Sequence, residues 1–296
     1  MLSCIEIRSF FSSKILFLTA LTGTPTQERG TMKKLFITAV SSLILVSCAT
    51  DDVAKIVETS PVAAPQSAVV EFMYCNFGSE MSAESWSDLK AAWLDINGGD
   101  DSPINAAFTL VPVIETDLYD GVWANVFADE ASRKAGWASW NESYAEAFQA
   151  KFGDVLTCHA DKTFAFTSSW SVRPAKQWDM GETHQAAYSF CSVNEGKTMA
   201  DSDKAADGFV AAMDAGRAQN GPDGYSSARM MPMFDPATAG GTVASFDYVQ
   251  SHYWDTSEEK AQGMKSWMMA GNPLRAAFEE AATCDNIDFE LNMLKM

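Results

Sequence analysis

The residues best suited to acid–base or ligand chemistry in this 296-residue chain are its three histidines, and His252 is the most informative of them. It lies in the run Ser251-His252-Tyr253-Trp254, beside two aromatic residues. A histidine in such surroundings can act as a general base or bind haem iron. The competing interpretation, which we favour, is a hydrogen-bonded histidine on a solvated strand face. His252 is therefore a weak candidate for a catalytic residue, and the catalytic set is unknown.

Aromatic residues could also form a ligand pocket. Most of the nine tryptophans belong to helical patterns, and we expect them in a hydrophobic core. Trp123 and Trp254 instead fall on or near expected strands, close to Asn125 and Tyr253. We therefore predict a pocket between helices and sheet that is lined by these four residues. Such a pocket would take a small apolar molecule.

Short motifs for nucleotide binding, hydrolysis or metal binding do not occur in the sequence. The acidic run from Asp95 to Asp101 suggests a calcium loop, but Ala106 occupies the twelfth position, where an EF-hand requires glutamate. We interpret the run as a solvated turn. The sequence predicts no metal site and no cofactor, although it excludes neither haem nor flavin.

The run from Met32 to Cys48 resembles a bacterial lipoprotein signal peptide that ends in a lipobox. Two lysines precede an apolar stretch of about a dozen residues, which is too short to span a bilayer. The resemblance implies that residues 32–47 are removed and that Cys48 carries a lipid anchoring the chain to a bilayer. Because Ala49 rather than aspartate follows Cys48, it also implies delivery to the outer membrane of the cell envelope, facing the periplasm.

The segments on either side of this signal have different interpretations. Residues 1–31 fit no role, and we interpret them as a spurious extension upstream of the true start. Residues 48–66 lack periodicity and contain Pro61 and Pro65, which predicts a flexible tether.

The chain is strongly acidic, with 21 basic and 39 acidic residues and a net charge of −18. Such a charge repels polyanions, so nucleic acid and anionic lipid surfaces are poor partners. The expected partners are the bilayer that holds the Cys48 lipid and either a small apolar ligand or an envelope protein.

Matching segments in the same order indicate that one unit occurs twice. The sequence FMYCNFGSEMSAE from Phe72 matches SFCSVNEGKTMAD from Ser189, and further matches follow in both copies. We assign residues 67–168 to the first repeat, 169–183 to a linker and 184–296 to the second repeat.

Each repeat is predicted to contain four strands and two helices. In the first repeat, strands are expected at 68–76, 106–115, 120–128 and 161–167, and in the second at 184–193, 225–234, 242–253 and 286–293. One helix follows the N-cap Ser82, and another carries aromatic residues from Trp137 to Phe148.

The order β-α-β-β-α-β resembles the ferredoxin-like unit, and two such units resemble a fused dimeric α+β barrel. The predicted fold class is therefore α+β, with two tandem ferredoxin-like repeats packed sheet against sheet as a pseudo-dimeric barrel. In a ferredoxin-like sheet the first and last strands are neighbours. This implies the disulfides Cys75–Cys158 and Cys191–Cys284, formed in the oxidising periplasm.

Two functions follow from these observations. The main hypothesis is an envelope-anchored lipoprotein that acts as a non-catalytic binding or interaction module. The alternative is a small-molecule enzyme, oxygenase-like and of the dimeric α+β barrel type, that uses an aromatic pocket in the second repeat. Some monooxygenases of that type combine Asn, Trp and His, and Asn76 or Asn125, Trp123 and His252 are the matching residue types here.

Overall fold

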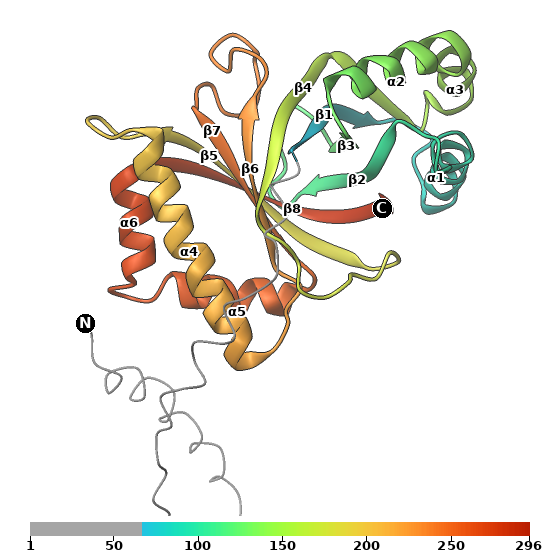
Figure 1. The fold of residues 1–296 in the computed structure, drawn as a ribbon. Helices are drawn as coiled ribbons and strands as arrows, with labels where there is room; N and C mark the ends of the chain where they lie inside the picture. Colours follow the sequence, from blue (N-terminus) through green and yellow to red (C-terminus); the bar gives the residue numbers. More distant parts are fainter. Residues whose placement is uncertain (1–66) are drawn as a thin grey trace, which may run out of the picture. The chain divides into compact units, whose positions relative to one another are not determined.

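The structure is a computed structural model that describes residues 67–296 (Figure 1). The predicted extension (1–31), signal peptide (32–47), tether (48–66) and lipid site at Cys48 lie outside the described residues. The strands are β1 (Ser67–Phe77), β2 (Ile104–Pro112), β3 (Gly121–Phe127), β4 (Leu156–Val172), β5 (Thr183–Val193), β6 (Ser226–Pro232), β7 (Tyr248–Trp254) and β8 (Ala282–Lys295). The helices are α1 (Ala83–Asn97), α2 (Glu130–Ser143), α3 (Ala145–Phe152), α4 (Met199–Asn220), α5 (Ser257–Trp267) and α6 (Pro273–Ala281).

All of these strands belong to one closed barrel with the order β1-β3-β2-β8-β5-β7-β6-β4. Every neighbouring pair is antiparallel, including β2 with β8 and β4 with β6, which join the two halves of the chain. The predicted fold class, with two ferredoxin-like repeats packed sheet against sheet, is therefore wrong. Two separate sheets would leave the edges of β2, β4, β6 and β8 unpaired, and closure removes every such edge.

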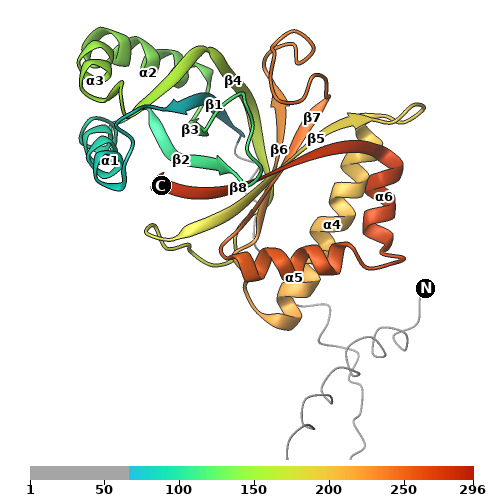
Figure 2. The ribbon, with the colours of Figure 1, turned by 180° about the vertical axis from the view of Figure 1, so that it is seen from behind.

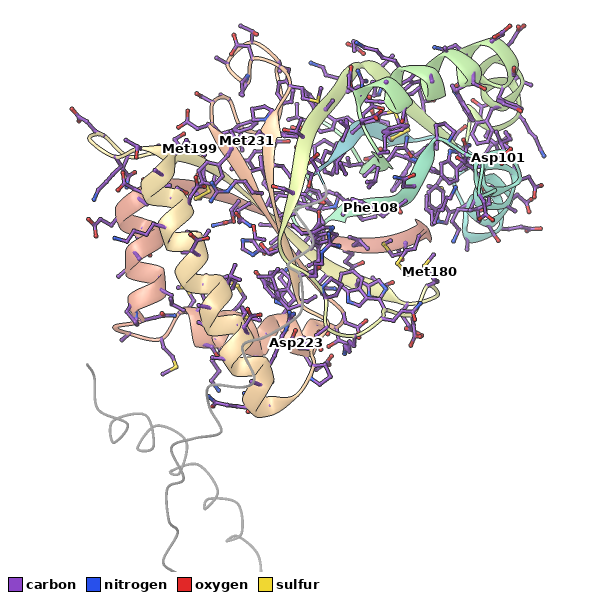
Figure 3. The ribbon with its side chains drawn as sticks, in the orientation of Figure 1. Asp101, Phe108, Met180, Met199, Asp223 and Met231 are labelled. Carbon is purple, nitrogen blue, oxygen red and sulfur yellow. A yellow bond between two sulfur atoms is a disulfide. The ribbon has the colours of Figure 1, made fainter. Side chains whose placement is uncertain are left out.

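The barrel has an aromatic interior and an outer face that the helices cover. Side chains such as Phe72, Phe108 and Tyr188 fill the interior, and Phe108 is labelled there in Figure 3. Helices α1 to α3 lie on one side of the barrel and α4 to α6 on another, in both views (Figures 1 and 2). None of the described helices is long and apolar enough to cross a membrane.

Local signals explain where the first two helices begin. Ser82 and Ser85 form a capping box at α1, in which each side chain accepts the other residue's backbone N–H at 3.1 and 2.9 Å. Asp129 caps α2 by accepting the Ser132 N–H at 2.7 Å. The helix expected from Trp137 to Phe148 is divided, because α2 ends at Ser143 and Tyr144 leaves the helical conformation before α3.

Three strands differ most from the ranges that the sequence predicts. β8 runs from Ala282 to Lys295 rather than from 286 to 293. β7 begins at Tyr248 rather than at 242, because the residues from 233 to 247 form a loop containing Gly240 and Gly241. β4 begins at Leu156 rather than at 161 and runs to Val172, beyond the predicted end at 167. Residues 166–169 pair with both β1 and β6, and the last residues of the strand pair with β6. That continuation is a long-range pairing, so no local pattern announces it.

The disulfides Cys75–Cys158 and Cys191–Cys284 are both present. They are the two pairs that the resemblance implies. In each case the two cysteines are direct partners in the register, between β1 and β4 and between β5 and β8. Each disulfide thus connects the first and last strands of its half, which are distant in sequence.

Candidate functional site

A row of unlike side chains crosses the outer face of the barrel. The register pairs Trp123 of β3 with Thr109 of β2, and Thr109 with Asn292 of β8. Paired residues of antiparallel strands project from the same face of a sheet. An indole, a hydroxyl and an amide therefore lie side by side, from three strands that are far apart in sequence.

Helix α1 stands over one end of this row and leaves a cleft of about 360 Å³. This volume lies within the range of ~300–1,000 Å³ that is typical of small-molecule sites. Most of the lining is apolar, and Ser82, Thr109 and Asn292 are its polar side chains. The lining residues are Cys75, Phe77, Met81, Ser82, Ala83, Trp86, Thr109, Leu110, Val111, Gly121, Val122, Trp123, Leu156 and Asn292.

The two indoles in the cleft wall are held in different ways. Trp123 donates its Nε1 hydrogen to Oδ1 of Asn125 at 3.1 Å, so its one donor is directed away from a ligand. Trp86 of α1 packs edge-on against Trp123, with ring centres 6.1 Å apart. Trp93 supports the other side of Trp123 at 5.2 Å. The wall therefore offers aromatic surface, which favours a flat apolar ligand.

The polar corner of the cleft is formed by Thr109 and Asn292. Asn292 accepts a hydrogen bond from the Thr183 hydroxyl at 3.1 Å, which leaves its amide N–H₂ group as a donor. Thr109 can donate and accept through its hydroxyl. A ligand with one carbonyl or hydroxyl group would find its partners at this corner.

A buried ion pair lies on the same outer face. The carboxylate of Glu71, a residue of β1 with no exposed surface, accepts hydrogen bonds from Arg133 and, at 2.7 Å, from Trp137 Nε1. Hydrogen bonds to Glu130 and Glu71 hold the pKa of the Arg133 guanidinium above its usual value. Glu71 is not part of the cleft lining. We therefore assign the pair to the attachment of α2 on the barrel rather than to chemistry.

The four residues predicted to share a pocket are separated in the structure. Trp123 and Asn125 lie together on the outer face of the first half, and Trp123 lines the cleft. Tyr253 lies in the barrel interior, whereas Trp254 packs with α4 residues on the outer face of the second half. Neighbouring residues in a strand point to opposite faces. This alternation is the signal in the sequence that separates Tyr253 from Trp254.

His252 lies on the outer face of the second half. Its Nδ1 and the Tyr225 hydroxyl are hydrogen-bonded at 2.8 Å, and its ring stacks on Trp254 with centres 5.9 Å apart. Burial lowers the pKa of His252 to about 4, and the nearby Asp288 only partly opposes this shift. The imidazole is therefore neutral at pH 7 and occupied by a protein partner, as expected of a structural histidine.

Acidification is expected to destabilise the fold through His252. Its folded pKa lies below the unfolded value of ~6.5, so its contribution to stability is complete above that pH and is lost as the pH falls towards the folded pKa. Between pH 7 and about pH 4.5 this amounts to about 2 kcal/mol. Urea unfolding at both pH values would measure this change in the free energy of unfolding. In His252→Gln the change should be smaller by about the same amount. Equal pH dependence in the variant would contradict the assignment.

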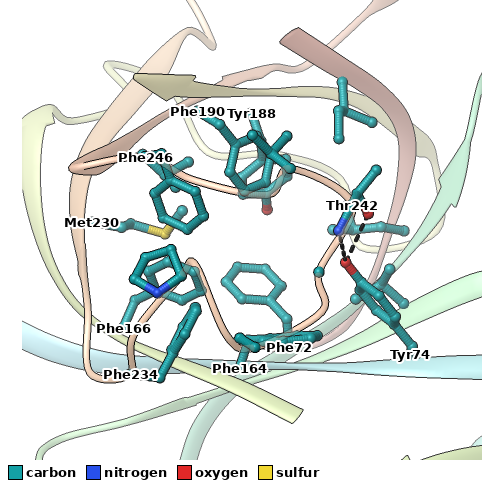
Figure 4. Close-up of a pocket in the computed structure, with 18 of the residues that line it drawn as sticks. Phe72, Tyr74, Phe164, Phe166, Tyr188, Phe190, Met230, Phe234, Thr242 and Phe246 are labelled. Carbon is teal, nitrogen blue, oxygen red and sulfur yellow. Dashed lines mark hydrogen bonds between the residues drawn. The ribbon is translucent and has the colours of Figure 1, made fainter. Parts of the chain in front are cut away.

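The barrel interior contains a second, smaller cavity of about 60 Å³ at the end where the loop from 233 to 247 lies (Figure 4). Its walls are almost entirely apolar. They include Phe72, Phe164, Phe166, Phe190, Phe234 and Phe246.

For several residues of these sites, the sequence alone does not predict a place in a binding site. Trp86 belongs to a helical pattern and reads as a core residue, whereas Thr109 and Asn292 meet only because β2 pairs with β8. Gly121 helps to form the cleft by carrying no side chain, and no local pattern reveals that. Within residues 67–296, no group of three or more His, Cys, Asp or Glu side chains is placed to hold a metal ion.

Comparisons with known proteins give only distant likenesses. No family model and no curated protein match the sequence. A candidate monooxygenase from Lactobacillus acidophilus NCFM has a TM-score of 0.43 at 9% identity, with 78% of this chain and 95% of that chain covered. An anthrone oxidase-like protein has a TM-score of 0.43 at 8% identity, covering 79% and 95%.

A chlorite dismutase variant from Candidatus Nitrospira defluvii also has a TM-score of 0.43 at 8% identity, covering 77% of this chain and 92% of that chain. Since every one of these scores is below 0.5, the likenesses carry no argument about family or activity.

Proposed function

We propose that this protein binds a small, flat and mainly apolar molecule in the cleft between α1 and the barrel. The observation that carries the proposal is the cleft of about 360 Å³ itself. Its walls are aromatic at Trp86 and Trp123, and its polar groups converge on one corner at Thr109 and Asn292. A ligand would bury its rings against the indoles and hydrogen-bond at that corner.

Filling the cleft without disturbing the core tests this proposal. A Cβ at Gly121 would lie 3.4 Å from the Leu110 carbonyl oxygen and 3.6 Å from the exposed ring of Phe77, both ordinary contact distances, so we expect Gly121→Val to fold and to reduce the free space. We expect it to weaken the binding of N-phenyl-1-naphthylamine, a neutral aromatic probe, at least about tenfold in a fluorescence titration. Gly181→Val, at a position with no atom within 4 Å of the added Cβ, is the matched control.

Thr109→Val tests the polar corner, because it keeps the shape of the side chain and removes its hydroxyl. For 1-naphthol as the probe, the loss of one hydrogen bond weakens binding by roughly three- to tenfold. Unchanged titrations for Gly121→Val in a folded protein, with an unchanged melting temperature, would rule out the cleft as the site.

An oxygenase-like reaction in the same cleft is a second candidate. Trp123 and Asn125, two of the residue types that such enzymes combine, are hydrogen-bonded to each other in its wall. The described lining contains no histidine, and His252 lies in the other half. Oxygen uptake on addition of a bound phenol, lost in Asn125→Leu, would support this candidate. If the phenol binds but no oxygen is consumed, the cleft is a binding site without oxygenase activity.

We also propose that the chain is anchored by lipid at Cys48 on the periplasmic side of the outer membrane. The lipobox-like sequence and two disulfides in the described part support this, because disulfides persist in oxidising compartments. Labelling with palmitate should mark the full chain and not Cys48→Ser, and a labelled variant would refute the anchor.

A further inference from the structure

The loop from 233 to 247 covers one end of the barrel. Alternate strands of an antiparallel barrel run in the same direction, so the β2–β3 and β6–β7 connections lie at the same end. Side chains of the loop, including Phe234, Val243 and Phe246, line the interior cavity. Figure 4 shows the loop passing around the mouth of this cavity with Phe234 and Phe246 pointing into it.

One residue provides the hydrogen bonds in the middle of the loop, while Phe234, Val243 and Phe246 pack against the core of the barrel. Its ends are pinned by the hydrogen bonds Met233 N to Ala165 O at 2.9 Å and Asp247 N to Cys191 O at 2.8 Å. Between them, Thr242 alone makes hydrogen bonds to the rest of the described chain. Its N–H donates to the Tyr74 hydroxyl at 3.0 Å, and its own hydroxyl lies 2.7 Å from the same oxygen (Figure 4).

This attachment can break without loss of the barrel. Gly240, with a φ of 65°, and Gly241 precede Thr242, so the adjoining backbone is unrestrained by side chains. Tyr119 adds a longer contact of 3.4 Å to the Thr242 hydroxyl. Loops of about fifteen residues without regular structure are uncommon in compact domains and often serve as lids. A further hydrogen bond lies at the end of the loop, where the Asp247 carboxylate accepts the Val193 N–H at 2.7 Å. The other contacts of the loop with the barrel are those of its apolar side chains.

The chamber beneath the loop selects by charge and shape. No side chain that carries a charge at neutral pH lines it in the described chain, so a charged ligand would lose its hydration without compensation. Phe72 meets Phe166 and Tyr188 edge-on, with ring centres 5.7 and 5.4 Å apart. A further aromatic ring would extend this packing. The cavity of about 60 Å³, whose mouth the loop only partly covers, is smaller than the ~150 Å³ that holds benzene in an engineered apolar cavity.

We propose that the barrel interior is a second binding chamber, which takes a neutral monocyclic aromatic molecule when the 233–247 loop opens. Thr242 and Tyr74 form the latch of this lid. Movement of Phe234 and Phe246 with the loop provides both the entrance and the additional volume. This chamber is separate from the cleft under α1. The proposal for the chamber does not depend on the function proposed for the cleft.

Hydrogen exchange of the full chain, with and without toluene, tests the lid and the chamber together. Tyr74→Phe removes the latch oxygen but keeps the ring that packs against Tyr119 and Phe164. Exchange within residues 234–246 should rise on the order of tenfold. Toluene should then protect the same peptide. Tyr144→Phe, at an exposed tyrosine on another part of the surface, is the matched control.

Val243→Phe places a ring from the loop into the cavity and should abolish the protection by toluene. Protection that persists in Val243→Phe, or exchange that is unchanged in Tyr74→Phe, would overturn the proposal. If Tyr74→Phe fails to fold, Thr242→Ala removes the latch hydroxyl from the loop side and should give faster exchange of the same peptide.

Discussion

Replacing Cys75 and Cys158 together by alanine is expected to lower the free energy of unfolding by about 4.5 kcal/mol. The disulfide joins residues separated by 83 positions. Its loss therefore raises the conformational entropy of the unfolded chain, which stabilises the unfolded state. Many domains are stable by only ~5–15 kcal/mol, so this change removes a large share of the total. Urea unfolding of the oxidised protein and the double variant would measure the difference.

The second disulfide provides the internal comparison for this prediction. Cys191 and Cys284 are separated by 93 positions, and the entropic cost depends only weakly on loop length. Their replacement should therefore cost nearly the same. A loss below about 1 kcal/mol in either double variant would show that the denatured chain is already constrained.

Arg133→Met is expected to cost about 3–5 kcal/mol, because it leaves the Glu71 carboxylate buried without its cation. Trp137 would still donate one hydrogen bond to Glu71, but no positive charge would remain beside it. The free energy of unfolding in urea, measured at pH 7, gives the size of the effect. Arg275→Met is the matched control, since Arg275 pairs with Glu279 on an exposed helical face, where such pairs contribute under ~1 kcal/mol.

The double variant Glu71→Gln/Arg133→Met separates charge from packing. Glutamine retains an oxygen for Trp137 and removes the buried charge. It should therefore recover part of the stability lost in Arg133→Met. If the double variant is less stable than Arg133→Met, the packing of the arginine stem, rather than its charge, holds α2 on the barrel.

Local patterns predicted many of the elements but not all of their limits. The capping serine Ser82 marks the start of α1, because capping depends on residues that are adjacent in sequence. The start of β7 and the end of β4 were misplaced, because both depend on partners in distant strands.

The candidate sites likewise combine features that nearby residues predict with features that depend on distant strands. The sequence drew attention to Trp123 and Asn125, which are two positions apart in a strand and therefore share a face. It grouped them with Tyr253 and Trp254, but β3 and β7 are not neighbours in the barrel. The predicted strands at 225–234 and 242–253 include parts of the loop from 233 to 247. That this loop lies over a cavity depends on residues of other strands, such as Phe72 and Phe164, which line the same cavity.

By itself, the sequence determined the periodicity of many strands and helices, and the ferredoxin-like resemblance that it carries implied the pairing of Cys75 with Cys158 and of Cys191 with Cys284. These features depend on nearby residues or on strands within one half of the chain. Only the tertiary structure decided that the strands close into one barrel, that Thr109 and Asn292 meet beside Trp123, and that Thr242 closes the interior. The reason is that these contacts depend on which edges pair across the two halves, and backbone hydrogen bonds between such edges carry no signature in the local sequence.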